Sequence, residues 1–162
     1  MAYIVGDREF WSLDFHVTQD VLIPRPETEF LLDRVFALTD SQNFVRGKIL
    51  DLCCGRGVIC TVLARETGQH VIGLDISGSA LQVAAINVKA HGQEHRVGFV
   101  LGNLLDCFIH NQRFSLIVSN PPYVSTVEVA SELAPEVAEY EPHLALDGGE
   151  RGMEKIEQIR MA

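Results

Sequence analysis

The sequence predicts an open α/β sheet whose strands run mostly parallel, and three observations support this fold class. Short apolar segments alternate with helical patterns between residues 48 and 119, which is typical of a parallel sheet covered by helices. Glycines directly follow the first of these segments, as in strand-to-helix turns. The chain has 162 residues, 47% of them hydrophobic, which is enough for one domain with a sizeable core.

The first 24 residues are expected to form an extended or hairpin segment, followed by a single domain over residues 25–162. Pro24 and Pro26 hold the backbone around Arg25 away from the helical region. Pro26 then suits the first position of a helix. This helix is expected to bury one apolar stripe, made of Phe30, Leu31, Val35 and Leu38.

Four strands and three further helices are predicted after Gly47. The strands are expected at residues 48–52, 71–74, 96–101 and 114–119. The helices are expected from 58 to a stop near Gly68, from 79 to 89, and from 153 to 160. The apolar face of the middle helix should consist of Leu81, Ala84, Ala85 and Val88. In such a sheet, ligands bind beyond the carboxyl ends of the strands, where the strand order reverses.

The charge of the chain argues against nucleic acid as its main partner. There are 22 acidic and 13 basic residues, a formal net charge of -9, and so acidic a surface binds phosphate poorly. No apolar stretch approaches the roughly 20 residues needed to cross a bilayer, and residues 1–10 lack the apolar region of a signal peptide. We therefore expect a cytoplasmic protein that does not associate with membranes.

Neither a metal site nor a disulfide framework is predicted. The four cysteines lack CxxC spacing; they are Cys53, Cys54, Cys60 and Cys107. His91 and His95 are four residues apart, but Gly92 lies between them and no third ligand follows. A solvated loop is the favoured interpretation of this pair.

The segment after the first predicted strand has the composition of a ligand-binding turn. It consists of Asp51, Leu52, Cys53, Cys54, Gly55, Arg56 and Gly57. Glycines let a backbone approach a ligand closely, although a Gly-x-Gly turn is equally typical of a plain strand-to-helix connection. The third glycine of a dinucleotide fingerprint is missing after Gly57, which disfavours NAD.

Polar residues also follow the next two strands. Asp75 ends the second strand, where a carboxylate can accept hydrogen bonds from both hydroxyls of an adenosine ribose. It equally suits the N-cap of the following helix. Asn103 and Leu104 follow the third strand, within reach of an adenine. The amide of Asn103 could recognise the exocyclic amine or cap the following turn, and the sequence leaves both alternatives open.

The most specific pattern is Asn120-Pro121-Pro122-Tyr123, directly after the fourth strand. Two prolines after a strand can be a rigid stop, over which a tyrosine packs. The combination with the preceding two features favours a functional site instead. These residues suit the methylation of a planar amide or amine nitrogen.

A carboxamide nitrogen is a poor nucleophile because its lone pair is delocalised, as the amide rotation barrier of ~18–20 kcal/mol shows. The side-chain oxygen of Asn120 and the carbonyl of Pro121 could accept hydrogen bonds from the NH2 group. They would aim it at the methyl group of a sulfonium donor and stabilise the developing positive charge. The Tyr123 ring could cover the planar group, and no strong base is required.

Three spaced motifs carry a resemblance to a known family: residues 23–29 (Ile-Pro-Arg-Pro-Glu-Thr-Glu), residues 120–123, and residues 140–149. From about Tyr3 to Met161, the chain resembles the peptide chain release factor glutamine methyltransferases, the HemK or PrmC family. The resemblance implies a Rossmann-like class I S-adenosylmethionine-dependent methyltransferase fold with S-adenosylmethionine as cofactor. It also implies a role in translation termination, with the glutamine of a Gly-Gly-Gln loop in a release factor as methyl acceptor.

The resemblance assigns expected roles to individual residues. The residues expected to bind the cofactor are Asp51, Cys53, Cys54, Gly55, Arg56, Gly57, Asp75, Asn103, Leu104 and Asn120. The residues expected to bind the substrate are Asn120, Pro121, Pro122, Tyr123, Glu141 and Pro142, of which the first four are also the expected catalytic residues.

The chain departs from the family pattern in three ways. Cys53 replaces the usual first glycine of the cofactor loop, and Asn103 stands where an aspartate is common. The N-terminal helical domain and the C-terminal strands of the family are missing, so we expect a truncated sheet that is incomplete at the C-terminus. The fourth strand would then be an unpaired edge, which self-association is expected to cover.

Two alternatives to glutamine methylation remain. One is an adenine exocyclic-amine methyltransferase of nucleic acid, against which the acidic charge and the motifs at 25–29 and 141–149 argue. The other is an inactive remnant that only binds the cofactor.

Overall fold

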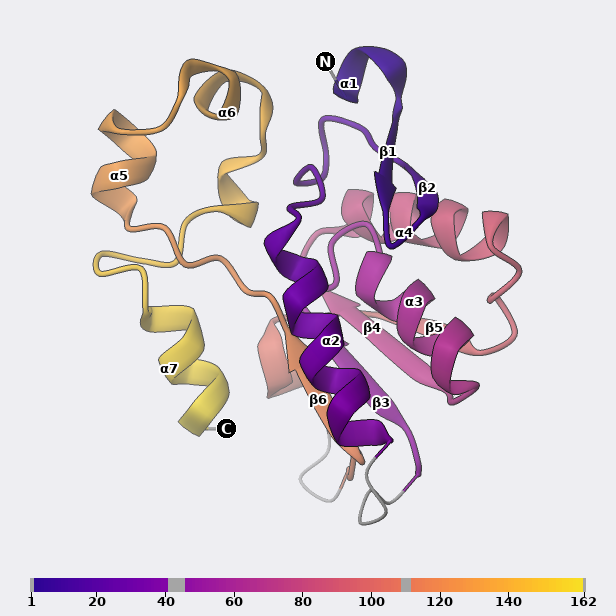
Figure 1. Ribbon diagram of the computed structural model, residues 1–162. Helices are drawn as coiled ribbons and strands as arrows, with labels where there is room; N and C mark the ends of the chain where they lie inside the picture. The colour runs from indigo at the N-terminus through magenta and orange to yellow at the C-terminus, as the bar shows by residue number, and fades with distance from the viewer. Residues whose placement is uncertain (1, 41–45, 109–111, 162) are drawn as a thin grey trace.

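Four parallel strands form the central sheet of the computed structural model, which describes residues 2–40, 46–108 and 112–161. They are β3 (Ile49–Leu52), β4 (Val71–Asp75), β5 (Val97–Leu101) and β6 (Leu116–Ser119). Their order is β5-β4-β3-β6, as Figure 1 shows, and every neighbouring pair is parallel. The predicted open parallel sheet is confirmed. The chain adds β4 on one side of β3 and β6 on the other, so the strand order reverses at β3.

The predicted strands and helices of the sheet region are confirmed, and the strand ends differ from prediction by two residues at most. The helices are α3 (Val58–Thr67), α4 (Gly78–Ala90) and α7 (Glu154–Met161). Gly68 ends α3 in the left-handed conformation, with φ 66°. On α4, Ala84 and Val88 are buried as predicted, whereas Ala85 is exposed.

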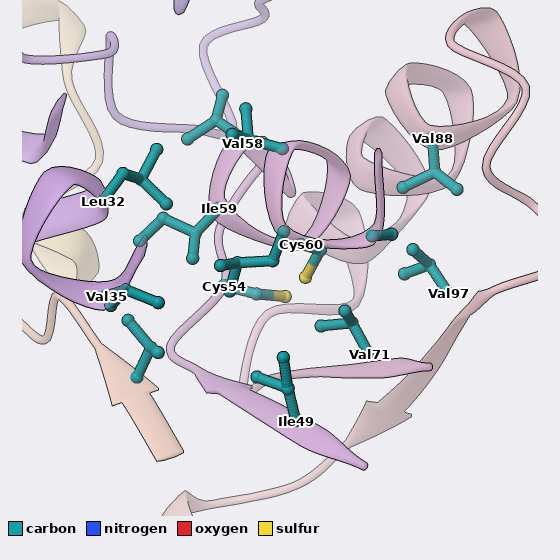
Figure 2. Close-up of a cluster of buried hydrophobic side chains, with 14 of the residues drawn as sticks. Leu32, Val35, Ile49, Cys54, Val58, Ile59, Cys60, Val71, Val88 and Val97 are labelled. Atoms are coloured by element: carbon teal, nitrogen blue, oxygen red, sulfur yellow. The ribbon is translucent and has the colours of Figure 1, made fainter. Parts of the chain in front are cut away.

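Both faces of the sheet are covered by apolar side chains. On one face, Ile49, Val71 and Val97 pack against α3, α4 and α2 (Glu27–Thr39), as Figure 2 shows. On the other face, leucines of β3 and β4 pack against the short helix η1 (Leu104–Cys107) and against Ile159 of α7. Because both faces are covered, all four residues of β3 are buried, as is typical of a central parallel strand.

The prediction for the buried stripe of α2 was wrong in part. Phe30 and Leu38 are 71% and 57% exposed. The helix buries Val35 as predicted, and with it Thr28 and Leu32 in place of Phe30 and Leu38. Apolar residues occupy more than one side of this helix, so periodicity alone does not select the buried side. Contact with α3 and the sheet selects it (Figure 2).

The N-terminal segment folds as α1 (Ala2–Val5) followed by a hairpin of β1 (Asp7–Phe10) and β2 (Leu13–His16). Asn87 of α4 fastens this hairpin to the rest of the molecule. Its Oδ1 accepts from the His16 amide at 2.7 Å, and its Nδ2 donates to the carbonyls of His16 and Arg56, both at 3.0 Å. The buried Asn87 therefore holds the hairpin against the turn that follows β3.

The chain between β6 and α7 contains helices that the sequence did not predict. They are α5 (Thr126–Ser131), α6 (Pro135–Tyr140) and η2 (His143–Ala145), and α5 and α6 stand apart from the sheet in Figure 1. Val124 joins the two ends of this segment, because its amide donates to Leu146 at 3.0 Å and its carbonyl accepts from Gly148 at 2.8 Å. Across the described residues, no helix has the length and apolar character needed to span a membrane.

Gly57 offers a test of the packing between α3 and α4. A Cβ at Gly57 (φ +79°) would lie 3.0 Å from the Cβ of Ala84, whereas one at Gly68 (φ +66°) would meet nothing within 4 Å. Both Gly57→Ala and Gly68→Ala introduce left-handed strain of about 1–2 kcal/mol. Only Gly57→Ala also overpacks the helix contact, so it should lower the free energy of unfolding by about 1–3 kcal/mol more in urea titrations. If the two variants lose the same free energy of unfolding, α4 does not pack tightly against the turn at Gly57.

Candidate functional site

A cavity of about 260 Å³ lies at the carboxyl ends of the strands. Each strand of the sheet contributes to its wall through a residue at or after its end: Gly55, Asp75, Asn103 and Asn120. This is the position at which an open parallel sheet binds ligands. The predicted site residues that line the cavity are Cys53, Cys54, Gly55, Arg56, Asp75, Asn103, Leu104, Asn120, Pro122 and Pro142.

Asp75 connects the turn after β3 to the turn after β4. Its Oδ2 accepts from the Gly55 amide at 2.7 Å, and its Oδ1 accepts from the Ser77 amide at 2.9 Å. The N-cap of α4 is Ser77, whose hydroxyl accepts from the Ala80 amide, so the N-cap role considered for Asp75 is wrong. A Cβ at Gly55 would meet no atom within 4 Å, which leaves open space beside this carboxylate.

Two residues other than glycine line the cavity with a left-handed backbone. Cys53 has φ 63° and Leu104 has φ 47°. Such a conformation costs about 1–2 kcal/mol per residue, and strain of this kind concentrates at functional sites. Cys53 therefore adopts the conformation that a glycine would adopt more easily, with its thiol held in a buried position that raises its pKa to about 12.

Five further residues that were predicted to belong to the site do not line this cavity: Asp51, Gly57, Pro121, Tyr123 and Glu141. Asp51 is fully buried beneath the turn. Its Oδ2 accepts from the amide and the thiol of Cys60, at 3.1 and 2.9 Å, so it anchors the start of α3. Gly57 precedes α3 and faces α4. Pro121, Tyr123 and Glu141 belong to the neighbouring region described next.

A second, smaller cavity of about 40 Å³ adjoins the first. Asn120 lines both cavities, and Pro121 and Tyr123 line the smaller one. The Asn120 amide nitrogen donates to the hydroxyl of Thr28 at 3.4 Å. This contact directs the nitrogen towards α2, and the side-chain oxygen therefore points to the opposite side of the same planar group.

An ion pair with a buried carboxylate joins two segments that are far apart in the sequence. Arg25 Nη2 lies 2.8 Å from Glu141 Oε1, and the Glu141 side chain is 3% exposed. Arg25 also lines the smaller cavity. The pair therefore brings residues 23–29 and 140–149 together, close to the residues that follow β6.

Gly148 explains why glycines occur in the second of these segments. A Cβ at Gly148 would lie 2.8 Å from the Pro122 carbonyl oxygen and 2.8 Å from the Tyr123 Cα. Since real Cβ atoms do not approach backbone so closely, only glycine fits there. The segment can thus lie directly against Pro122 and Tyr123 and hold them in place.

Sequence reasoning missed the part of the wall that comes from residues 19–22, from η2 and from α7. The missed residues include Gln19, Asp20, Val21, Leu22, Leu144, Ala145 and Lys155. Leu22 lines both cavities, and its position directly before the Ile-Pro-Arg-Pro motif was the one available signal. The others depend on how the segment after the hairpin, η2 and α7 fold over the sheet.

Comparison with known proteins gives three findings. Residues 27–151 match the family model described as methyltransferase small domain. The chain is 43% identical to the release factor glutamine methyltransferase of Koribacter versatilis, over 97% of this chain and 55% of that protein. It is also 43% identical to that of Cereibacter sphaeroides, over 98% of this chain and 54% of that protein. The chain thus spans about half the length of the curated relatives it matches.

Among solved structures, the chain is similar to the catalytic domain of human hMettl16 in complex with MAT2A 3'UTR hairpin 6. The TM-score is 0.68 at 14% identity, over 91% of this chain and 55% of that chain. At this identity the likeness shows the fold alone.

Asp51 should make stability depend on pH. Burial raises its pKa from 3.8 to about 7, so the folded state binds the proton more tightly than the unfolded chain does. The free energy of unfolding therefore falls as pH rises from about 4 to about 7, and levels off above that. In Asp51→Asn, the difference in the free energy of unfolding between about pH 4 and about pH 8 should be smaller by on the order of 4 kcal/mol. Urea titrations at the two pH values measure it. As a control, Asp14→Asn, at an exposed position, should leave the pH dependence of the free energy of unfolding unchanged. If Asp51→Asn also leaves it unchanged, Asp51 is not its source.

Proposed function

This chain belongs to the methyltransferase small-domain family, and we propose that it methylates the side-chain amide nitrogen of a glutamine in a peptide chain release factor. The observation that carries the proposal is the position of Asn120, which borders both the large cavity and the small one. Asn120 therefore faces the proposed methyl-donor site on one side and the proposed methyl-acceptor site on the other. The names of its relatives support the choice of acceptor.

The large cavity suits S-adenosylmethionine as the methyl donor. The fold is that of the class I methyltransferases, as expected. Asp75 and the open space beside Gly55 suit the ribose of a nucleoside, because each carboxylate oxygen retains a lone pair beyond its present backbone contact. When bound, the donor supplies an electrophilic methyl group on a positively charged sulfur.

The small cavity suits the planar carboxamide of the acceptor. Asn120 Oδ1 and the Pro121 carbonyl would each accept one hydrogen bond from the NH2 group, and the exposed ring of Tyr123 would cover its plane. Thr28 holds the Asn120 amide in the required orientation. Two fixed acceptors aim the nitrogen and stabilise the positive charge that develops on it.

The step forms one N–C bond and breaks one S–C bond. The nitrogen supplies the electron pair for the new bond, and the pair of the broken bond stays on sulfur. The methylated nitrogen then loses a proton to water, so no side chain has to act as a strong base. Because the proposed acceptor is a translation factor, the proposal carries a cytoplasmic location with it.

Asn120→Ala tests this proposal. Loss of one of two preorganised acceptors should lower methyl transfer to a purified release factor about 100-fold or more, measured with labelled S-adenosylmethionine at saturating donor. Gln112→Ala, which removes an exposed amide that lines neither cavity, should transfer at the native rate. The proposal fails if the native chain transfers no methyl group to the release factor. It also fails if the chain methylates adenine in an RNA oligonucleotide instead.

We further propose that the β6 edge mediates self-association. Within the described chain, β6 is bonded to β3 alone, and its Ile117 is 45% exposed. An exposed apolar edge strand readily pairs with another chain.

Sedimentation should therefore show a concentration-dependent dimer, which Ile117→Lys shifts to monomer. Val127→Lys, on the exposed surface of α5, should leave the dimer intact. A native chain that stays monomeric at all concentrations would contradict this proposal and leave the proposed methylation untouched.

A further inference from the structure

The guanidinium group of Arg56 is buried in the wall of the large cavity without hydrogen-bond partners for two of its nitrogens. The residue is 7% exposed and lines the cavity. Its Nε and Nη1 have no partner among the residues that the structure describes. A buried cation left in this state is costly, because protein contacts do not replace the water it has lost.

The groups around Arg56 do not neutralise it. Its electrostatic neighbours are Tyr3, Glu141 and Arg25. The Oε1 of Glu141 is already paired with Arg25 at 2.8 Å, and its buried Oε2 forms no hydrogen bond with Arg56 or any other described residue. Tyr3 is uncharged at neutral pH, and burial raises its pKa further, to about 12. Its hydroxyl donates to the Val21 carbonyl at 2.8 Å. These four residues therefore carry two positive charges and one negative charge.

Burial lowers the pKa of Arg56 to about 9, which agrees with a cation that lacks its counterion. The Arg56 backbone is fixed by the hydrogen bond from Asn87 Nδ2 to its carbonyl. The guanidinium is thus presented from a rigid turn. Nε and Nη1 each form, together with Nη2, a planar pair of N–H donors that matches a carboxylate.

We propose that Arg56 binds the α-carboxylate of the methionine part of the methyl donor. This inference rests on the proposed function, because it takes the large cavity to be the donor site. The donor carries one carboxylate, and Asp75 on the wall suits its ribose hydroxyls. Arg56 then distinguishes the whole donor from nucleosides that lack the amino-acid carboxylate.

Two ligands that differ only in this carboxylate test the inference: S-adenosylhomocysteine and decarboxylated S-adenosylhomocysteine. Calorimetry on the native chain should show about 10- to 100-fold tighter binding of the first. Arg56→Met should reduce this ratio to near one, mainly by weakening the ligand that has the carboxylate. Retained affinity for the decarboxylated ligand shows that the variant is folded, and Arg56→Lys, which keeps the charge without the fork, should give an intermediate ratio.

Lys155 provides the matched control, because it is another basic side chain on the cavity wall. Lys155→Met should keep the native ratio. An unchanged ratio in both Arg56 variants, or a ratio that collapses in Lys155→Met instead, would overturn the role of Arg56 but not the proposed function. Failure of the native chain to bind S-adenosylhomocysteine would overturn both. Binding of adenosine monophosphate that depends on Arg56, without such dependence for S-adenosylhomocysteine, would assign the site to a phosphate and also overturn the inference.

Discussion

The left-handed backbone between β3 and α3 is the constraint on which the rest of the site depends. Cys53, Gly55 and Gly57 have φ values of 63°, 53° and 79°. This path brings the Gly55 amide to the carboxylate of Asp75 and lets α3 begin against α4. Without this path the Gly55 amide would not reach Asp75, and the turn that lines the large cavity would follow a different course. The strain at Cys53 shows that the path is kept even where a glycine is absent.

The second half of the site depends on long-range contacts instead of local backbone geometry. The Arg25–Glu141 ion pair bridges residues 116 positions apart, and Gly148 lies directly against Pro122 and Tyr123. Loss of Arg25 would leave the buried Glu141 carboxylate uncompensated, which is strongly unfavourable. The residues after β6 are thus held by two segments distant in the chain, which suits a site that must aim a weak nucleophile accurately.

The buried ionisable groups divide between support and binding. Asp51 receives two hydrogen bonds from Cys60 and anchors α3 from below. Arg56, only a few residues later, lines the cavity and lacks a complete set of partners. Strand β3 therefore contributes a group whose role is structural, and the turn that follows it contributes one that is available to a ligand. Their different surroundings, rather than their residue types, separate the two roles.

The sequence by itself determined the strands of the sheet, the helices α3, α4 and α7, and the residues that follow each strand. These features follow from apolar periodicity and from the φ preferences of glycine and proline, which act over a few residues. Only the tertiary structure decided that α2 buries Leu32 and not Phe30, that Asp51 lies beneath the cavity, and that Arg25 pairs with Glu141. Each of these outcomes depends on contacts between segments distant in the chain, for which no local pattern provides a signal.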